Sequence, residues 1–179
     1  MDIGFQITAI VILLAFYGCY FTKMILQRNK GIQTNQMGKG KMGFVKRIEV
    51  TMKIASFLVP AAELVSIVLN TSCLPLWARI TGALTGGCGV LVFILAVVTM
   101  RDSWRAGVSE AERTELVTGG IYQISRNPAF LGFDLVYIGM ALMFFNWVLL
   151  AISVFAGLMF QLQIVNVEED FLVRSFGKD

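Results

Sequence analysis

Three charged residues could do chemistry, because they flank long apolar runs where two chain segments can return to the same place. Arg126 directly precedes Asn127-Pro128 at the start of one apolar run, and Glu168-Glu169 follow the last one. Asn is a favourable helix N-cap and Pro fits the first helical position. A helix start with free N–H groups beside an arginine favours carboxylate-bearing ligands. We therefore predict a polar pocket between a basic helix start and an acidic helix end, with a structural salt bridge between the two ends as the alternative.

Two further acidic residues lie inside apolar runs, where burying a charge in lipid is expensive. They are Glu63 and Asp134. Each is expected either to face a polar cavity or to pair with a cation, and pairing alone could explain Glu63. Asp134 lies eight residues after Arg126, so it is expected close to the predicted pocket.

The composition removes several familiar kinds of active site. The chain contains no histidine, which excludes a Ser–His–Asp triad, an HExxH zinc site and a histidine-ligated haem. The three cysteines, Cys19, Cys73 and Cys88, form no CxxC pair and lie in or beside apolar segments. Such cysteines behave as small hydrophobic residues. No metal site is predicted.

The elements that must position the charged residues are membrane-spanning helices. Of the 179 residues, 56% are hydrophobic and only 15% are charged, whereas a soluble domain has about a quarter charged residues. About 20 apolar residues cross a bilayer as a helix. We therefore predict an all-α integral membrane protein, whose first span is retained and is not a cleavable signal peptide. Five spans are expected, at 3–26, 50–69, 74–100, 129–145 and 148–165, the last two short and joined as a helical hairpin.

The basic residues predict the orientation, because positive charge stays on the cytoplasmic side. Crossing five times places every Lys and Arg except Arg79 on one side. The N-terminus is therefore expected outside, and the C-terminus and the pocket in the cytoplasm. With no organelle signal, a bacterial inner membrane is the expected location. The net charge of +3 belongs to loops beside anionic lipid head groups, so no nucleic-acid partner is expected.

Glycines in the third span suggest how the helices pack. Gly82 and Gly86 form a GxxxG pattern, which lets two membrane helices approach closely. Helix packing is the interpretation we adopt, and a ligand role is the alternative.

Several motif elements follow one another in a specific order in the last part of the chain. They are Leu116-Val117, Gly120, Tyr122, the run Arg126-Asn127-Pro128-Ala129-Phe130-Leu131-Gly132, a helical hairpin, Glu168-Glu169 and Phe176-Gly177. Together they resemble the isoprenylcysteine carboxyl methyltransferase and phospholipid methyltransferase superfamily. The resemblance covers residues 103–177. It divides the chain into three N-terminal spans, residues 1–102, and a methyltransferase core, residues 103–179.

The resemblance implies that S-adenosylmethionine binds in a cytoplasm-facing pocket over the start of the fourth span. Glu168 would accept hydrogen bonds from its ribose hydroxyls or ammonium group, and the helix start would hold its carboxylate. A small lipophilic or lipid-like acceptor would enter from the bilayer. The implied cofactor-binding residues are Glu115, Leu116, Val117, Tyr122, Asn127, Pro128, Ala129, Phe130 and Glu168.

Three charged residues are the candidates for a catalytic role: Arg126, Glu169 and Asp134. Glu169 or Asp134 could take a proton if the acceptor is an amine or a hydroxyl. A carboxylate acceptor would need no base. Methyl transfer otherwise needs in-line alignment and the exclusion of water.

The chain departs from the family pattern at three positions. Asn127 replaces a histidine and Phe130 replaces a tyrosine. Ile164 stands four residues before Glu168, where the prenylcysteine enzymes carry a substrate-binding arginine, which argues against a prenylcysteine substrate. Family members usually continue into a basic, aromatic tail, so a chain ending at Asp179 is expected to be naturally short or trimmed.

Two other functions fit the same predicted helices. One is a membrane reductase of the sterol-reductase type that would use NADPH. The other is a non-catalytic membrane protein such as a scaffold or a transporter subunit. A transporter would more often carry broken helices in paired halves, and no such internal repeat is found in the sequence.

Overall fold

The computed structural model describes residues 3–38, 41–107 and 116–177. No β-strand occurs in these ranges. The helices are α1 (Ile3–Asn29), α2 (Gly43–Leu69), α3 (Leu76–Met100), α4 (Pro128–Met143), α5 (Trp147–Gln163) and α6 (Glu169–Phe176). Two short 3-10 turns, η1 (Arg101–Ser103) and η2 (Gly120–Gln123), lie between α3 and α4, and a π-helical turn, η3 (Ile164–Glu168), joins α5 to α6.

The predicted all-α integral membrane fold is confirmed. Four helical segments are long and apolar enough to cross a membrane: Ile3–Asn29, Gly43–Leu69, Leu76–Ser103 and Trp147–Arg174. The fifth predicted span is the shorter apolar helix α4, of 16 residues. One expectation needs correction, because the last span is not marginal in length. Helical structure continues from α5 through η3 into α6 and makes a segment of 28 residues.

The second span is also longer than its apolar run predicted. Helix α2 begins at Gly43, seven residues before the predicted start at 50. Its first two turns carry the charged residues Lys46, Arg47 and Glu49. These residues interrupt the apolar run but do not prevent helix formation, since Lys, Arg and Glu are good helix formers. Pro60 lies inside α2.

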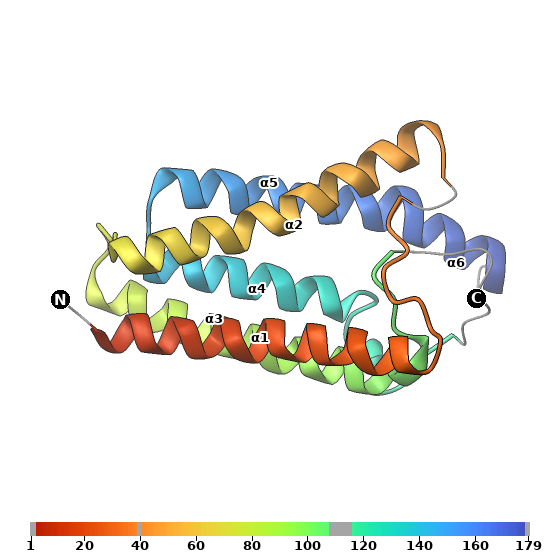
Figure 1. The fold of residues 1–179 in the computed structure, drawn as a ribbon, viewed down its shortest axis with the longest axis horizontal. Helices are drawn as coiled ribbons and strands as arrows, with labels where there is room; N and C mark the ends of the chain where they lie inside the picture. Colours follow the sequence, from red (N-terminus) through yellow and green to blue (C-terminus); the bar gives the residue numbers. More distant parts are fainter. Residues whose placement is uncertain (1–2, 39–40, 108–115, 178–179) are drawn as a thin grey trace.

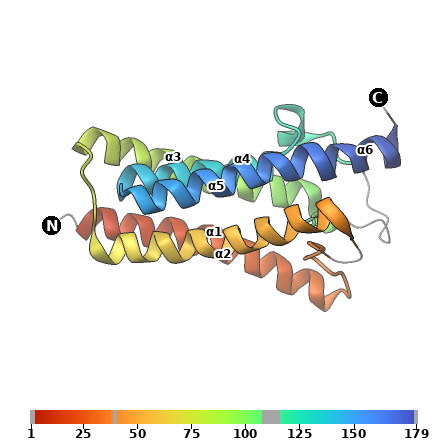
Figure 2. The same ribbon diagram turned by 90° about the horizontal axis from the view of Figure 1, so that it is seen from above.

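The helices run along one common axis, with the start of α1 and the end of α6 at opposite ends of the molecule (Figure 1). Helix α3 packs against α4 and also against α1, and α2 packs against α5. In the view from above, α1 and α2 lie along one side of the bundle, and α3, α4 and α5 along the other (Figure 2). We call one end of the bundle the loop end: it holds segments 30–38, 101–107 and 116–127 and helix α6.

Small residues set the contact between α3 and α4. A Cβ atom added to Gly82 would lie 2.6 Å from the carbonyl oxygen of Gly139, and one added to Gly89 would lie 2.8 Å from that of Gly132. Real Cβ atoms do not approach backbone so closely, so the two helices meet backbone to backbone. The interpretation of the GxxxG pattern as a packing motif is confirmed, and its partner is the glycine row of α4.

Polar side chains hold the end opposite the loop end. Arg79 Nε donates to the carbonyl oxygen of Met143 at 3.0 Å, and its Nη2 donates to Asn70 Oδ1 at 3.2 Å. The guanidinium also lies 4.3 Å from the centre of the Phe5 ring. Asn146 caps α5 by accepting from the Leu149 N–H at 2.8 Å. The contacts of Arg79 tie α1, α3, α4 and the C-cap of α2 together at this end.

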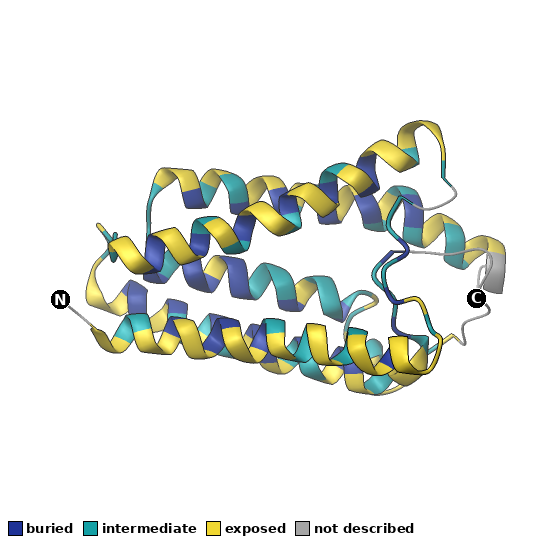
Figure 3. Ribbon diagram, in the orientation of Figure 1, coloured by how far each residue is buried: buried dark blue, intermediate teal, exposed yellow. Residues whose placement is uncertain are grey.

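The outer surface of the bundle is apolar, as a lipid-facing surface must be. Exposed residues cover the outward faces of the helices, and buried residues face inward (Figure 3). Leu14 and Val68 are examples, at 69% and 76% exposed. Hydrophobic residues therefore occur both inside and outside, the arrangement expected for a membrane span.

The expectation that Glu63 pairs with a cation or faces a polar cavity is wrong. Its side chain is fully buried inside the bundle, and neither carboxylate oxygen has a hydrogen-bond partner among the described residues. The hydroxyls of Tyr17 and Tyr137, which are also buried, lie within electrostatic reach of this carboxyl group. The charge pattern of the sequence could not reveal this, because both tyrosines are distant in sequence.

Candidate functional site

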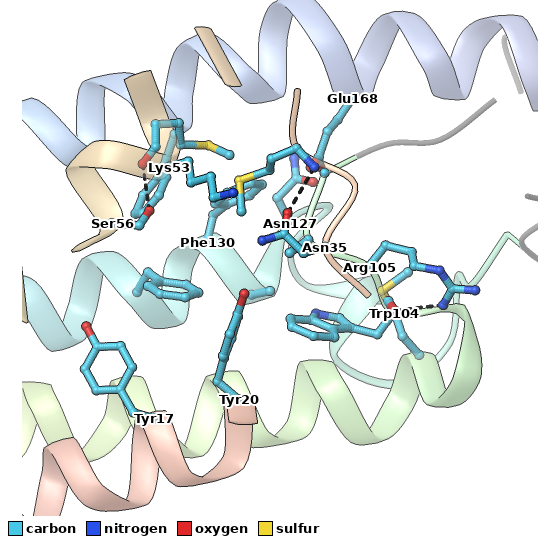
Figure 4. A pocket seen from close by; sticks show the side chains of 18 of the residues that line it. Tyr17, Tyr20, Asn35, Lys53, Ser56, Trp104, Arg105, Asn127, Phe130 and Glu168 are labelled. Atoms are coloured by element: carbon cyan, nitrogen blue, oxygen red, sulfur yellow. Dashed lines mark hydrogen bonds between the residues drawn. The ribbon is translucent and has the colours of Figure 1, made fainter. Parts of the chain in front are cut away.

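A cavity of about 700 Å³ opens at the loop end. Its walls come from α1, α2, α4 and the segment from α5 to α6, and its roof comes from the loops (Figure 4). The deeper part is apolar and aromatic. The residues that line this part include Leu13, Tyr17, Met52, Phe57, Phe130, Phe133 and Phe160.

Most residues predicted to bind the cofactor meet in this cavity. Pro128 is buried as the first residue of α4, beside the lining residues but not among them. Glu115 lies outside the described residues. The predicted residues that line the cavity are Leu116, Val117, Tyr122, Asn127, Ala129, Phe130 and Glu168.

The three residues predicted to have a catalytic role lie in different places. Arg126 lines the cavity with an exposed side chain. Glu169 is exposed on α6 and does not line the cavity. Asp134 is outside the lining too, and its Oδ1 lies 3.4 Å from the position of a Cβ added to Gly157 on α5. The catalytic roles of all three stay predictions.

Helix geometry explains why Glu169 and Asp134 lie outside the lining. Neighbouring residues on an α-helix point about 100° apart. Glu168 and Phe133 line the cavity, and the residue that follows each of them points to a side of the helix that does not face the cavity. Proximity in sequence therefore predicted proximity to the site but not the direction of the side chain.

Glu168 and Asn127 meet across the cavity mouth. With its amide nitrogen facing the carboxylate, Asn127 donates to Glu168 Oε2 at 3.2 Å. Asn127 occupies the N-cap position of α4, but its side chain makes no capping hydrogen bond, so the expectation that it caps the helix is wrong. No Arg126–Glu168 ion pair occurs within the described part of the chain. The salt-bridge alternative is thereby not supported, and the two helix ends meet through a neutral amide.

Tyr122 completes this group of polar side chains. It lies in η2 and is partly buried against the cavity. Burial, and next the negative charge of Glu168, raise the pKa of the Tyr122 hydroxyl well above its ordinary value. Tyr122 therefore stays neutral at ordinary pH and can act as a hydrogen-bond donor.

The roof of the cavity is fixed by bonds between two loops. Gln27 Nε2 donates to the carbonyl oxygen of Trp104 at 2.9 Å, and Thr34 Oγ1 donates to Gln27 Oε1 at 2.7 Å. The Ala106 N–H donates to the carbonyl oxygen of Thr34, and the Gln36 N–H donates to that of Ala106, both at 2.9 Å. Segments 34–36 and 104–106 thus form one rigid cover.

A buried cluster of bonds around Glu49 joins α2 to α5 near Glu168. The Glu49 side chain is fully buried and forms an ion pair with Lys41, whose side chain is 17% exposed. Glu49 also accepts from the Gly38 N–H at 2.6 Å and from Gln163 Nε2 at 3.3 Å. Because Gln163 directly precedes η3, this cluster sets the position from which Glu168 extends.

The site also uses residues for which no role was predicted. Tyr17 and Tyr20 from α1, and Lys53 and Ser56 from α2, line the cavity (Figure 4). A signal was present in the sequence, because each pair lies three residues apart inside an apolar run and so falls on one helix face. Among the described residues, no group of three potential metal ligands is found.

A comparison with family models identifies the part of the chain that carries the polar mouth of this site. The model for phospholipid methyltransferases matches residues 77–179. The matched part includes Tyr122, Asn127 and Glu168, the three residues that form the polar mouth. Comparisons with curated proteins and with solved structures yield no match. Since the family match covers more than half of the chain, the chain belongs to the phospholipid methyltransferase family.

Proposed function

We propose that this membrane methyltransferase uses S-adenosylmethionine and acts on a small lipophilic or lipid-like acceptor. One observation carries the proposal: Glu168, Asn127 and Tyr122, which are distant in sequence, meet at the mouth of one cavity at the start of α4. The cavity joins this polar mouth to an apolar interior, as a site for a polar donor and a lipophilic acceptor requires.

The residues at the mouth fit such a cofactor. No side chain caps α4, so the first backbone N–H groups, at Ala129 and Phe130, are open to a ligand carboxylate. Glu168 can accept hydrogen bonds from ribose hydroxyls or an ammonium group. When bound, S-adenosylmethionine supplies the electrophilic methyl group. The protein then has to orient the donor and the acceptor in line and exclude water.

The rest of the cavity suits the exclusion of water. Phe160 packs against both Phe130 and Phe133, with ring centres 5.2 Å apart for Phe130–Phe160 and 5.4 Å apart for Phe133–Phe160. Glu168 is the one carboxyl group among the described residues that line the cavity. A carboxylate or a neutral amine fits this site best as the acceptor, because neither needs a protein base before it attacks.

The acceptor would enter from the bilayer. Leu14 and Phe21 of α1, and Phe57 and Leu64 of α2, line the cavity and are also exposed on the outer surface. The cavity therefore opens between α1 and α2 onto the lipid-facing side. We further propose that the loop end faces the cytoplasm of a bacterial cell, because the basic loops gather there.

Glu168→Ala is expected to weaken S-adenosylmethionine binding at least tenfold. The reason is the loss of hydrogen bonds to a charged group, each worth about 1.5–3 kcal/mol, and about 1.4 kcal/mol corresponds to a factor of ten. Isothermal titration calorimetry on the detergent-purified protein measures the dissociation constant. The matched control is Glu169→Ala, which removes the neighbouring carboxylate but one that lies outside the cavity, and it is expected to bind like the wild type.

The same titration decides between the remaining functions. Unchanged binding in Glu168→Ala would place the donor elsewhere. A wild-type protein that binds NADPH and not S-adenosylmethionine would support a reductase. A folded protein that binds neither would support a non-catalytic role.

A further inference from the structure

Asn35 brings a neutral hydrogen-bond donor from the N-terminal half of the chain into the cavity. It lies in the roof, and its side chain points into the cavity (Figure 4). The family match begins at residue 77, so it does not include this residue. The backbone of Asn35 forms a bridge with Ala106, and the bonds between segments 34–36 and 104–106 hold it in place. The roof therefore presents Asn35 to the site in a fixed position.

A bond within the loop determines the orientation of the Asn35 amide. Its Oδ1 accepts from the Met37 N–H at 3.2 Å. The oxygen of a side-chain amide accepts hydrogen bonds and the nitrogen only donates, so Nδ2 is the atom that faces away from this N–H group. No hydrogen bond from Nδ2 to another residue is found within residues 3–38, 41–107 and 116–177. Asn35 therefore offers its two N–H groups to a ligand.

Aromatic side chains line the same part of the cavity. Trp104 lies two residues before Ala106, the bridge partner of Asn35, and lines the cavity. Tyr20 of α1 lines it too and packs edge to face against Trp104, with ring centres 5.6 Å apart. Planar bases stack readily against aromatic rings. An N–H donor beside such rings suits a planar heterocycle whose ring nitrogens carry free lone pairs.

We propose that Asn35 recognises the adenine base of the donor by donating from Nδ2 to the ring nitrogen N1. This inference rests on the proposed function and takes the ribose hydroxyls as the partners of Glu168. On adenine, N1 and the amino group lie on the edge farthest from the ribose. The base then extends away from Glu168 and presents this edge to the roof. Asn35 is thus a specificity-determining residue for the donor, and it comes from outside the segment that the family model matches.

The test compares two nucleosides that differ at this edge of the base. S-adenosylhomocysteine presents a lone pair at N1, whereas S-inosylhomocysteine presents an N–H group there, which repels another donor. Both compounds carry the same charges, so a charge added to the protein affects them equally. Isothermal titration calorimetry on the detergent-purified wild type is expected to show at least about a tenfold preference for the adenosyl compound, the effect of one hydrogen bond gained or opposed.

Asn35→Asp is expected to reverse this preference. The new carboxylate can still accept from the Met37 N–H, so the loop keeps its bond. Its second oxygen replaces the N–H donors and accepts from N1–H of the inosyl compound. Affinity for the adenosyl compound is expected to fall about tenfold. The matched control is Gln33→Glu, the same change from amide to carboxylate at an exposed position of this loop outside the cavity, which is expected to keep the wild-type preference.

Each alternative outcome has a distinct meaning. A wild type that binds both compounds equally, or an Asn35→Asp variant that keeps the wild-type preference, would overturn the inference and leave the proposed function intact. Loss of affinity for both compounds by the same factor would assign Asn35 a role in the structure of the loop and overturn the inference too. A folded wild type that binds neither compound would overturn the proposed function, and this inference with it.

Discussion

Gly139→Ala is expected to destabilise the helix bundle by about 3 kcal/mol, the upper range for overpacking a tight interior. A Cβ atom at this position would lie 2.6 Å from the Gly86 nitrogen and 2.7 Å from the Gly82 carbonyl oxygen. These neighbours are backbone atoms of α3 and cannot rotate away, so α3 and α4 would have to separate. Thermal unfolding in detergent, followed by circular dichroism, measures the loss.

Gly87→Ala provides the matched control for this experiment. Gly87 lies on α3 between the packing glycines Gly82 and Gly89, and a Cβ atom added there meets nothing within 4 Å. Alanine in the middle of a helix is more favourable than glycine by about 0.5–1 kcal/mol, so this variant is expected to be slightly more stable. Equal effects of the two substitutions would contradict the backbone-to-backbone contact between α3 and α4.

Lys41→Met is expected to destabilise the protein by about 3 kcal/mol, because it leaves the fully buried Glu49 carboxylate without its cation. The remaining partners of Glu49 are the Gly38 N–H and Gln163 Nε2, which do not neutralise its charge. Because Glu49 joins α2 to α5 beside η3, S-adenosylmethionine binding is expected to weaken as well. Chemical unfolding and calorimetry measure the two effects.

A second substitution tests whether the uncompensated charge causes the loss. Lys41→Met combined with Glu49→Gln removes the charge but keeps a polar side chain, so most of the lost stability is expected to return. Lys46→Met, at an exposed position on α2, is expected to leave stability unchanged. A double variant as unstable as Lys41→Met alone would show that the lysine contributes through its packing and not through its charge.

The helices themselves could be predicted because apolar runs of this length have few alternatives in a membrane. The start of α4 at Pro128 followed from the preference of proline for the first helical position. The start of α2 at Gly43 did not, because Lys46 and Glu49 look like loop residues until the buried partners of Glu49 are known. Hydropathy indicates whether lipid or water surrounds a segment. It does not indicate the ion pairs and hydrogen bonds that allow a helix to continue beyond its apolar run.

Only the part of the candidate site that comes from the C-terminal half of the chain could be predicted. The motif order placed Tyr122, Asn127 and Glu168 at one site, and the cavity brings these three residues together. Lys53 and Tyr17 also line it, and they come from helices that resemble the family only in being hydrophobic. A single sequence does not contain the side-by-side arrangement of α1 and α2 with α4, so the wall that would face the acceptor could not be derived.

The direction of each side chain was the other feature that could not be predicted from the sequence, and the π-helical turn η3 shows why. Its i→i+5 bonds take up one residue more than an α-helical turn. Because each residue of an α-helix turns the chain by about 100°, removing one residue from η3 would rotate Glu168 away from Asn127 while α5 kept its packing. The direction of the Glu168 side chain is thus determined by the number of residues in Ile164–Glu168. Two relatives with the same residues at every motif position could therefore differ in donor binding through the deletion of one residue in η3. Such a deletion would predict the loss of donor binding as strongly as a substitution of the glutamate.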